Sequence, residues 1–452
     1  MGRSLRYPGL RIFTLTLAFF FSCFNGRTDS NPELALLFIR SSSLVPRFVF
    51  VSNRQVASLS AFSIDPASGM LSQVSGSPFA IGPASGGSAC QPVVDLSGRY
   101  VYNANAPGGS IYGFSIDVAS RTISSIPGMP VTGLNQTLPV AIDSRSRYVF
   151  ASENNSGGFL KEFTIGSNGG LTQIGSVNGG TQPSYPIVDT FDRFVFVGDF
   201  SGTNSAYPYK IDPSTGGLTV GANPTYNAVS SLPAIEPSGR LLFMQNTAGG
   251  VNGALLYSFL IDQNSGGLAF VDQDLMTGGP QGIGLPATTP NPPAPVVTPD
   301  GRFLYVSLTQ NGNNGVAGYS IDYSSGRLTA IPGHPFATTG DTVQQPAIHP
   351  SGRFMYVANS SSSTIDAFAI NSSTGALSAI AGSPFSAGTG PGPVVIDRGG
   401  YFAFVPNNNS GAGNTVSVFR IDSDSGVLRQ VNGSPFTAGT GPLGIAVASY
   451  TE

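Results

Sequence analysis

One series of side chains in this sequence has the types that acid–base chemistry requires. Most of its members are carboxylic acids and one is an imidazole, and each stands four residues before a recurring arginine or its equivalent: Asp95, Asp143, Asp189, Glu236, Thr298, His349 and Ile396. A hydrolytic reaction needs a group that activates water and donors that stabilise an oxyanion. If the fold gathers this series at one place, His349, Glu236 and Asp189 are the candidate catalytic residues.

The same series also has a purely structural interpretation. An acid four residues before an arginine can reach it across a tight turn, and the ion pair would then fix that turn. The pairs are Asp95 with Arg99, Asp189 with Arg193, and Glu236 with Arg240. A catalytic site is made of unlike residues, whereas a structural device is repeated. The repetition therefore favours the structural interpretation over the catalytic one.

The elements that would position this series are copies of one repeat. An aromatic-x-Ile-Asp signature occurs eight times with small changes, at intervals of 46 to 60 residues. The copies begin at Phe62, Phe114, Phe163, Tyr209, Phe259, Tyr319, Phe368 and Phe419. Self-similarity at a period of about fifty residues is typical of propeller blades.

Each copy contains four short apolar segments separated by turn residues. A Pro-Val-Val or Pro-Ala-Ile run comes first, a segment such as Arg353-Phe-Met-Tyr second, and the signature third; a Gly-rich turn then leads to a Leu or Ile. Four antiparallel strands per unit indicate a propeller. We expect an all-β propeller of eight blades, with seven as the alternative count. Its innermost strands would bring the acidic series to one mouth of the central channel.

The ends of the repeat predict how the ring closes. The first unit starts at Arg47, directly in its second strand, and one run at residues 445–449 is left over at the C-terminal end. We expect that run to be the innermost strand of the first blade, which would leave no exposed strand edge in the ring. The rival donor is residues 33–40, whose apolar run stops too early for the register.

Residues 346–359 carry a family resemblance. They read Pro-Ala-Ile-His-Pro-Ser-Gly-Arg-Phe-Met-Tyr-Val-Ala-Asn, and Ile-Asp-Ala-Phe-Ala-Ile and Ser-Thr-Gly-Ala-Leu follow. Such units resemble those of the lactonase-type β-propellers, which include bacterial 6-phosphogluconolactonases and YVTN-repeat surface proteins, and the resemblance spans roughly residues 46–450. It implies hydrolysis of sugar lactones that carry a phosphate or carboxylate, held by basic groups. These propellers usually have seven blades, so an eighth blade would alter the channel mouth. We identify no Arg or Lys outside the repeated set that clearly faces the channel.

Residues 1–22 have the features of a secretory signal. Three arginines precede an uncharged apolar run over residues 12–21, which is too short to span a bilayer. A small serine then precedes Cys23, in a pattern that resembles the relaxed lipobox of spirochaetes. We expect Cys23 to be lipidated, residues 23–45 to form a linker and residues 46–452 to form the propeller. The alternative is cleavage nearby, with Cys23 discarded or left as a free thiol.

Composition excludes several other classes of function. Once the three arginines of the leader are removed from the 21 basic residues, 18 remain against 24 acidic ones, which argues against a nucleic-acid partner. Only two histidines occur, and no His/Cys/Asp cluster has metal-ligand spacing, so we expect neither a metal nor another cofactor. Cys90 is expected to be buried as a small hydrophobic residue.

These observations lead to one expected function and one enzymatic alternative, with a purely structural envelope protein as a third possibility. We expect an exported lipoprotein of the bacterial cell envelope, at the outer membrane, whose monomeric propeller is a non-catalytic platform for a protein or carbohydrate ligand. The membrane would be contacted through the lipid. The alternative is a lactone hydrolase similar to 6-phosphogluconolactonase. On the first interpretation, the purified domain would hydrolyse sugar lactones no faster than buffer.

Overall fold

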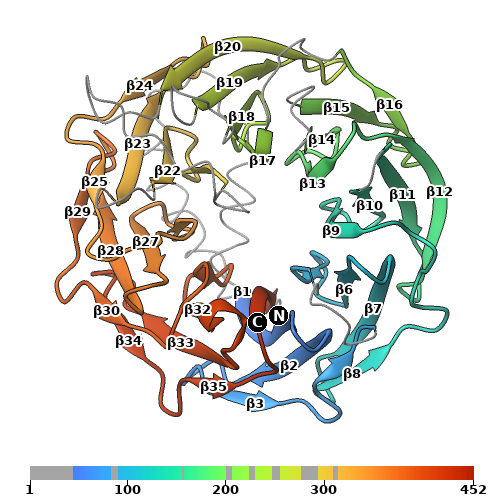
Figure 1. The fold of residues 1–452 in the computed structure, drawn as a ribbon, viewed down its shortest axis with the longest axis horizontal. Coiled ribbons are helices and arrows are strands. Elements are labelled where there is room, and N and C mark those ends of the chain that lie inside the picture. The colour runs from blue at the N-terminus through green and yellow to red at the C-terminus, as the bar shows by residue number, and fades with distance from the viewer. Residues whose placement is uncertain are drawn as a thin grey trace, which may run out of the picture. The chain divides into compact units, whose positions relative to one another are not determined.

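The fold is an all-β propeller of eight blades (Figure 1). The computed structural model describes residues 44–82, 90–154, 157–199, 206–222, 230–246, 255–275, 294–308 and 314–451. Eight antiparallel sheets surround a central axis, each built on a path of four neighbouring strands. In four of the sheets a short fifth strand pairs with the third strand of the blade. The predicted fold and the count of eight blades are confirmed. The predicted signal and Cys23 lie outside the described residues.

Each blade runs from an innermost strand at the axis to an outer strand at the rim. Blades 1 to 4 contain β1 (Leu44–Asn53), β2 (Ser58–Ile64), β3 (Leu71–Gln73), β4 (Phe79–Ala80), β5 (Val93–Val94), β6 (Tyr100–Asn105), β7 (Ser110–Asp117), β8 (Thr122–Ser125), β9 (Thr137–Ile142), β10 (Tyr148–Glu153), β11 (Phe159–Ile165), β12 (Leu171–Asn178), β13 (Pro183–Val188), β14 (Phe194–Asp199), β15 (Ala206–Ile211) and β16 (Leu218–Val220).

Blades 5 to 8 repeat this order, and the last strand of the chain belongs to blade 1. These strands are β17 (Ser230–Ile235), β18 (Leu241–Asn246), β19 (Leu255–Ile261), β20 (Leu268–Leu275), β21 (Val296–Val297), β22 (Phe303–Leu308), β23 (Gly315–Ile321), β24 (Leu328–Ala330), β25 (Phe336–Ala337), β26 (Ala347–Ile348), β27 (Phe354–Asn359), β28 (Thr364–Ile370), β29 (Leu377–Ala379), β30 (Phe385–Ser386), β31 (Val395–Ile396), β32 (Phe402–Asn407), β33 (Thr415–Ile421), β34 (Leu428–Gln430), β35 (Phe436–Thr437) and β36 (Pro442–Thr451). A 3-10 turn, η2 (Asn409–Gly411), lies between β32 and β33.

The repeated arginine–aromatic segment joins each blade to the next. In blade 7, Arg353 donates hydrogen bonds to two carbonyls of the turn at residues 423–424 in blade 8, at 3.2 and 2.9 Å. The buried hydroxyl of Tyr356 donates to the carbonyl of Gly426 in the same turn, at 2.8 Å. Phe354 packs on Gly426 so closely that a Cβ there would stand 2.5 Å from its ring. Blade 6 makes equivalent contacts with blade 7. The arginine–aromatic segment therefore joins neighbouring blades.

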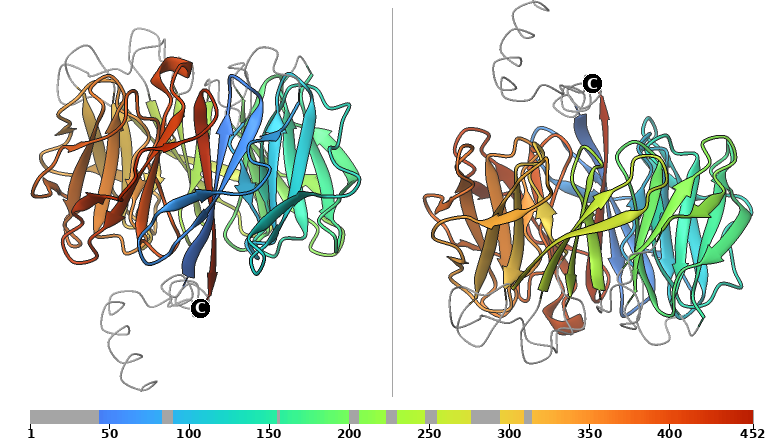
Figure 2. Two further views of the ribbon diagram at one scale, coloured as in Figure 1. Left: turned by 90° about the horizontal axis from the view of Figure 1, so that it is seen from below. Right: turned by 90° about the horizontal axis from the view of Figure 1, so that it is seen from above.

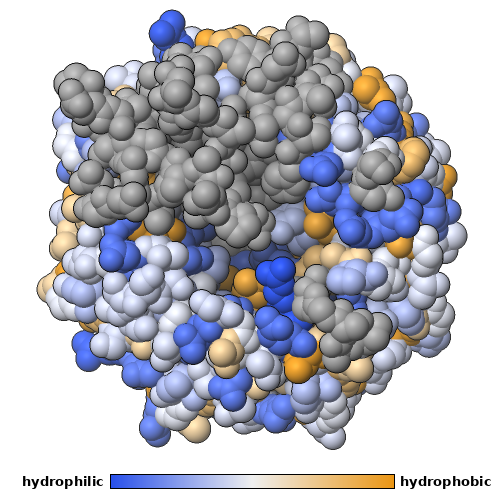
Figure 3. Space-filling model, in the orientation of Figure 1, coloured by the Kyte–Doolittle hydropathy of each residue, from blue (hydrophilic) through white to orange (hydrophobic). Residues whose placement is uncertain are grey.

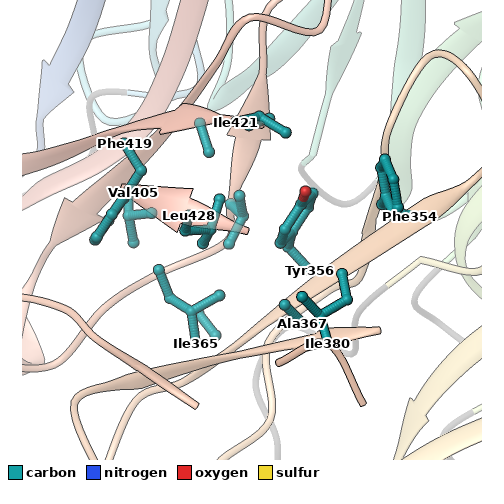
Figure 4. Packing of buried hydrophobic residues seen from close by; sticks show 12 residues of the cluster. Phe354, Tyr356, Ile365, Ala367, Ile380, Val405, Phe419, Ile421 and Leu428 are labelled. Carbon is teal, nitrogen blue, oxygen red and sulfur yellow. The ribbon is translucent and has the colours of Figure 1, made fainter. Parts of the chain in front are cut away.

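The hydrophobic core consists of separate clusters between neighbouring blades. The cluster between blades 7 and 8 is shown in Figure 4, where side chains from both sheets face one another. Its buried members are Phe354, Tyr356, Ala358, Ile365, Ala367, Ile380, Val394, Ala403, Val405, Phe419, Ile421 and Leu428. Because each blade buries its faces only against its two neighbours, the ring has to close for every blade to be covered.

The C-terminal strand closes the ring, as predicted. β36 pairs antiparallel with β1 from Leu44 opposite Thr451 to Asn53 opposite Pro442, and it forms the innermost strand of blade 1. The strand is longer than the predicted run of residues 445–449, and β1 begins two residues before the predicted start of the domain. Among the described residues, no helix is long and apolar enough to cross a membrane.

Candidate functional site at the channel mouths

The propeller has two different faces. We call one the turn face, because it carries the tight turns between the first and second strands of blades 2 to 8, at residues 95–99 and their equivalents. The other is the loop face, which carries the connections between the second and third strands, such as residues 54–57. Figure 2 shows η2 at the loop face and the C-terminal end of β36 at the turn face. Each face has one mouth of the central channel.

Asp189, one of the predicted catalytic residues, stabilises its own turn by accepting hydrogen bonds. Its side chain is buried, and Oδ1 accepts hydrogen bonds from the backbone N–H groups of Arg193 and Phe194, at 2.5 and 2.8 Å. Oδ2 accepts from Nε of Arg193 at 2.8 Å and completes the predicted ion pair. Asp143 and Arg147 repeat this arrangement in blade 3. The carboxylate of Asp189 is therefore already satisfied by its turn.

Glu236 and His349 each form a hydrogen bond within their own turn and also contact the next blade. Glu236 is buried and accepts from the N–H of Ser238 at 3.0 Å, and a Cβ on Gly301 of blade 6 would stand 2.2 Å from its Oε1. His349 is buried as well; its Nδ1 lies 3.1 Å from the N–H of Ser351, and its Nε2 lies 2.9 Å from the carbonyl of Gly400 in blade 8.

The contacts of His349 define its protonation state. Because Nδ1 accepts from an N–H group and Nε2 donates to a carbonyl, the imidazole is neutral. Burial lowers the pKa of His349, and the nearby Arg353 lowers it further, while the bond to the Gly400 carbonyl opposes the shift. The imidazole therefore links the turn of blade 7 to the turn of blade 8 through a hydrogen bond.

The structure corrects the register of the series in blade 8. Ile396 was expected at the turn position, but Asp397 occupies it: the N–H of Phe402 donates to Asp397 Oδ1 at 2.6 Å, as the N–H of Tyr100 does to Asp95 at 2.7 Å. Burial raises the pKa of Asp397 to about 6, although several backbone N–H groups oppose the shift.

The predicted catalytic residues are therefore not brought together. Asp189, Glu236 and His349 belong to blades 4, 5 and 7, all on the turn face, and each is bonded within its own turn or to the turn of the next blade. This arrangement supports the structural interpretation of the repeated acids. A catalytic role for these three residues stays a prediction.

The mouth on the loop face combines three chemically different groups. Arg54 follows β1 of blade 1, Cys90 precedes β5 of blade 2 and Tyr185 lies in β13 of blade 4. The charge of Arg54 lowers the pKa of both Cys90 and Tyr185, and Cys90 in turn acts on Tyr185. Side chains from these three blades can influence one another only where they converge near the axis. Figure 3 views the loop face, whose surface is hollowed at the centre with hydrophilic side chains beside the hollow.

Desolvation dominates the acid–base properties of this mouth. It raises the pKa of the Cys90 thiol to about 12 and that of the Tyr185 phenol to about 12, against the opposing effect of Arg54. Both groups are therefore protonated at neutral pH. Cys90 is partly exposed rather than buried in the core, and its Sγ lies 3.5 Å from the carbonyl of Thr137. The prediction that it is a buried core residue holds only in part.

Sequence analysis missed the two arginines that stand out at the mouths. Arg54 is the only basic residue at its position in the eight repeats, and its N–H donates to the carbonyl of Gly441 at 2.7 Å. Arg398, next to Asp397, is likewise the only basic residue at its position, on the turn face. Arg398 interacts electrostatically with Asp95 two blades along the ring, and burial lowers its pKa. Alignment of the repeats position by position would have found both.

The described part of the chain offers no site for a metal ion. Its residues contain no group of three or more His, Cys, Asp or Glu side chains that could hold one. The single cysteine among them, Cys90, is a free thiol.

The chain matches a known protein family. The model described as "Lactonase, 7-bladed beta-propeller" matches residues 98–219, 287–387 and 347–446, which together cover more than half of the chain. Among curated proteins, a 6-phosphogluconolactonase of Formosa agariphila is 39% identical over 69 residues. That match covers 15% of this chain and 19% of the relative's length.

Solved structures with the same fold include enzymes of different activity. A periplasmic gluconolactonase of Pseudomonas aeruginosa aligns with a TM-score of 0.56 and 21% identity, over 81% of this chain and 100% of its own. A dihydro-heme d1 dehydrogenase in complex with its ligand aligns with a TM-score of 0.55 and 14% identity, over 90% of this chain and 75% of its own. At these identities the likeness concerns the fold alone.

These matches correct the expected function. The expectation of a non-catalytic binding platform is wrong, because the matching family model and the named relatives are lactonases. They favour the alternative, a lactonase-like hydrolase. The error arose because the repeated acids on the turn face were the only acid–base set considered, and their structural use was taken to mean that no site existed.

Proposed function

Because this chain belongs to the family of lactonase seven-bladed β-propellers, in an eight-bladed form, we propose that it hydrolyses lactones of sugar acids at the mouth on the loop face. The observation that carries the assignment to this mouth is the position of Arg54, Cys90 and Tyr185 beside or within innermost or second strands of three blades, together with the effect of the Arg54 charge on the pKa of the other two. The acids at the opposite mouth are bonded within their turns.

The residues at this mouth suit the charge that develops in lactone hydrolysis. Water adds to the carbonyl carbon and the carbonyl oxygen becomes an oxyanion. The ring C–O bond then breaks, and the ring oxygen leaves as a hydroxyl that takes up the proton lost by the added water, so that the product is a hydroxy acid. Tyr185 is protonated, since its pKa is about 12, and its hydroxyl can donate a hydrogen bond to the oxyanion. The positive charge of Arg54 stabilises the same oxygen or an anionic group of the substrate.

Cys90 does not act as a nucleophile in this proposal. A thiol with a pKa of about 12 contains very little thiolate at neutral pH, and the thiolate is the reactive form. The reaction therefore proceeds by direct attack of water and not through a thioester. The positive charge of Arg54 at this mouth favours substrates that carry a phosphate or a carboxylate.

The test is lactone hydrolysis by the purified propeller at neutral pH, with the spontaneous rate subtracted. We expect Arg54→Ala and Tyr185→Phe to lower kcat/KM by roughly 10²-fold, the loss typical of one oxyanion donor. Arg398→Ala is the matched control, because it removes the other unique arginine at the opposite mouth, and it should leave the rate unchanged. A loss with Arg398→Ala and none with Arg54→Ala would place the site on the turn face. No rate above buffer with phosphorylated or carboxylated sugar lactones would refute the proposed activity.

We further propose that the enzyme is exported and anchored through Cys23. The basic n-region, the uncharged apolar run and the serine before Cys23 support this proposal. Leu44, the first residue of β1, pairs with Thr451 at the turn face. The chain therefore enters the propeller at the turn face.

A further inference from the structure

Asn103 is a buried polar residue at a position that is otherwise apolar in this repeat. It is the fourth residue of β6, and its side chain is fully buried, with 0% exposed. The equivalent residues of the other seven second strands are Val51, Ala151, Val197, Met244, Val306, Val357 and Val405. Burying an amide costs free energy unless both of its polar atoms are paired. A polar residue at a position that is apolar in the other seven copies lowers stability, and such an exception indicates a position used for function.

Only half of the Asn103 amide is paired within the protein. Nδ2 donates to the carbonyl of Cys90 at 2.7 Å, whereas Oδ1 has no partner among the described residues. The N–H of Cys90 donates to the carbonyl of Ala104 at 3.0 Å. The peptide groups on both sides of the Cys90 side chain are therefore held by two consecutive residues of β6.

The equivalent segments of blades 7 and 8 have the bond from the N–H group to the second strand but no bond from a side chain of that strand to the carbonyl; in blade 7 the carbonyl of Gln344 accepts instead from Oγ of Ser307 in blade 6, at 2.5 Å. The N–H of Gln344 donates to the carbonyl of Ala358 at 2.9 Å, and that of Gly392 to the carbonyl of Pro406 at 2.8 Å. The neighbouring residues of those second strands are valines, which cannot donate to the carbonyl. The additional bond from Asn103 is therefore a feature of blade 2.

Blade 1 confines the same segment from the other side. A Cβ on Gly444 of β36 would stand 2.6 Å from the Cα of Gln91, so the two innermost strands are in close contact there. Gly444 is itself fixed, because its N–H donates to Oγ of Ser52 at 3.1 Å. Cys90 and Gln91 thus lie between a rigid glycine contact and the Asn103 bond.

We propose that Asn103 is a positioning residue that holds the segment of Cys90 and Gln91 against the mouth beside Arg54 and Tyr185. This inference rests on the proposed function for its catalytic consequence, and on geometry alone for its effect on Cys90. Asn103 does not contact the substrate; it acts through the Cys90 carbonyl. Without that bond the segment can move, the partly exposed Cys90 thiol becomes more accessible, and the groups beside it lose their alignment.

The test compares the wild type with Asn103→Val, which installs the residue of the equivalent positions, in a Cys23→Ser background where Cys90 is the only thiol. Three quantities are measured: the Tm, the rate at which Cys90 reacts with an aromatic disulfide reagent, and kcat and KM for a phosphorylated sugar lactone. We expect an unchanged or higher Tm, thiol reaction at least tenfold faster, and kcat at least tenfold lower with a smaller change in KM. Val357→Thr, at the equivalent position of blade 7, is the control for a substitution in a second strand and should alter neither the thiol reaction nor kcat.

The outcomes separate this inference from the proposed function. A lower Tm with unchanged thiol reactivity would overturn it, because Asn103 would then be a structural residue only. If Asn103→Val does not fold, Asn103→Leu, which has nearly the same shape, is measured in the same way. If the wild type hydrolyses no lactone, the proposed function fails, while the thiol reaction still decides whether Asn103 positions Cys90.

Discussion

Ring closure by β36 predicts an unusual response to substitution of Ile445. This residue is 2% exposed and packs between blades 8 and 1, among Phe402, Phe404 and Val49. Ile445→Ala removes three buried carbons, which at about 0.8 kcal/mol each is a loss of about 2.4 kcal/mol, and incomplete collapse of the cavity can raise it to about 5 kcal/mol. The chain joins β36 to the rest of the ring only through the N-terminal end of the strand. The substitution should therefore lower the free energy needed to detach β36 from the ring.

Native-state hydrogen exchange measures that detachment directly. If β36 can leave the ring separately, a loss of about 2.4 kcal/mol speeds the exchange of its amides about 60-fold, at 1.36 kcal/mol per factor of ten. The amides of β26–β29 in blade 7 should change much less. Val394→Ala is the matched control, because Val394 is the equivalent residue of blade 8, is 5% exposed and directly precedes β31, whose two ends are both continuous with the ring.

The result that refutes this reasoning is equally specific. If Ile445→Ala accelerates the exchange of all eight blades to the same extent, then β36 does not open separately and the ring unfolds only as a whole. If Val394→Ala gives the same local pattern in β36, the effect does not come from closure. Either outcome would mean that the terminal position of β36 has no energetic consequence.

Four further predictions concern His349, Asp397, the joint between blades and the lipid anchor. The folded-state pKa of His349 is lowered, so its contribution to stability is present above the usual pKa of about 6.5 and is lost as pH falls; His349→Gln should flatten this part of the plot of unfolding free energy against pH. Asp397 has the opposite sign, because its pKa is raised to about 6, so its contribution is lost as pH rises from about 4 to about 6, and Asp397→Asn should remove that loss. Tyr356→Phe removes the bond to Gly426 and should lower the free energy of unfolding by about 0.5–1.5 kcal/mol in urea titration, whereas no change would show that the hydroxyl does not contribute to the joint. Cells fed labelled palmitate should label the wild type and not Cys23→Ala; equal labelling of both would refute the lipid anchor.

The blade count and the closure were predictable because they depend on local patterns that recur. The strand order, the Gly-rich turns and the arginine–aromatic segment can each be recognised within one repeat of about fifty residues. The eight copies of the repeat can be aligned with one another. The leftover run after residue 441 could be matched to the first unit by alignment alone. The one error of register, Ile396 for Asp397, fell in the copy whose arginine is replaced.

The candidate site could not be predicted in the same way. Arg54, Cys90 and Tyr185 lie in three different repeats, and nothing in their local sequence relates them. They meet because blades 1, 2 and 4 direct the ends of their strands toward one axis, and their pKa values are set by burial at that meeting point. Conversely, the acids that looked catalytic in sequence are bonded by their turns and by the next blade. The sequence by itself determined the repeat and hence the fold, since each strand and turn is a local choice; only the closed ring decided which unlike residues face one another, since that depends on contacts between blades far apart in the chain.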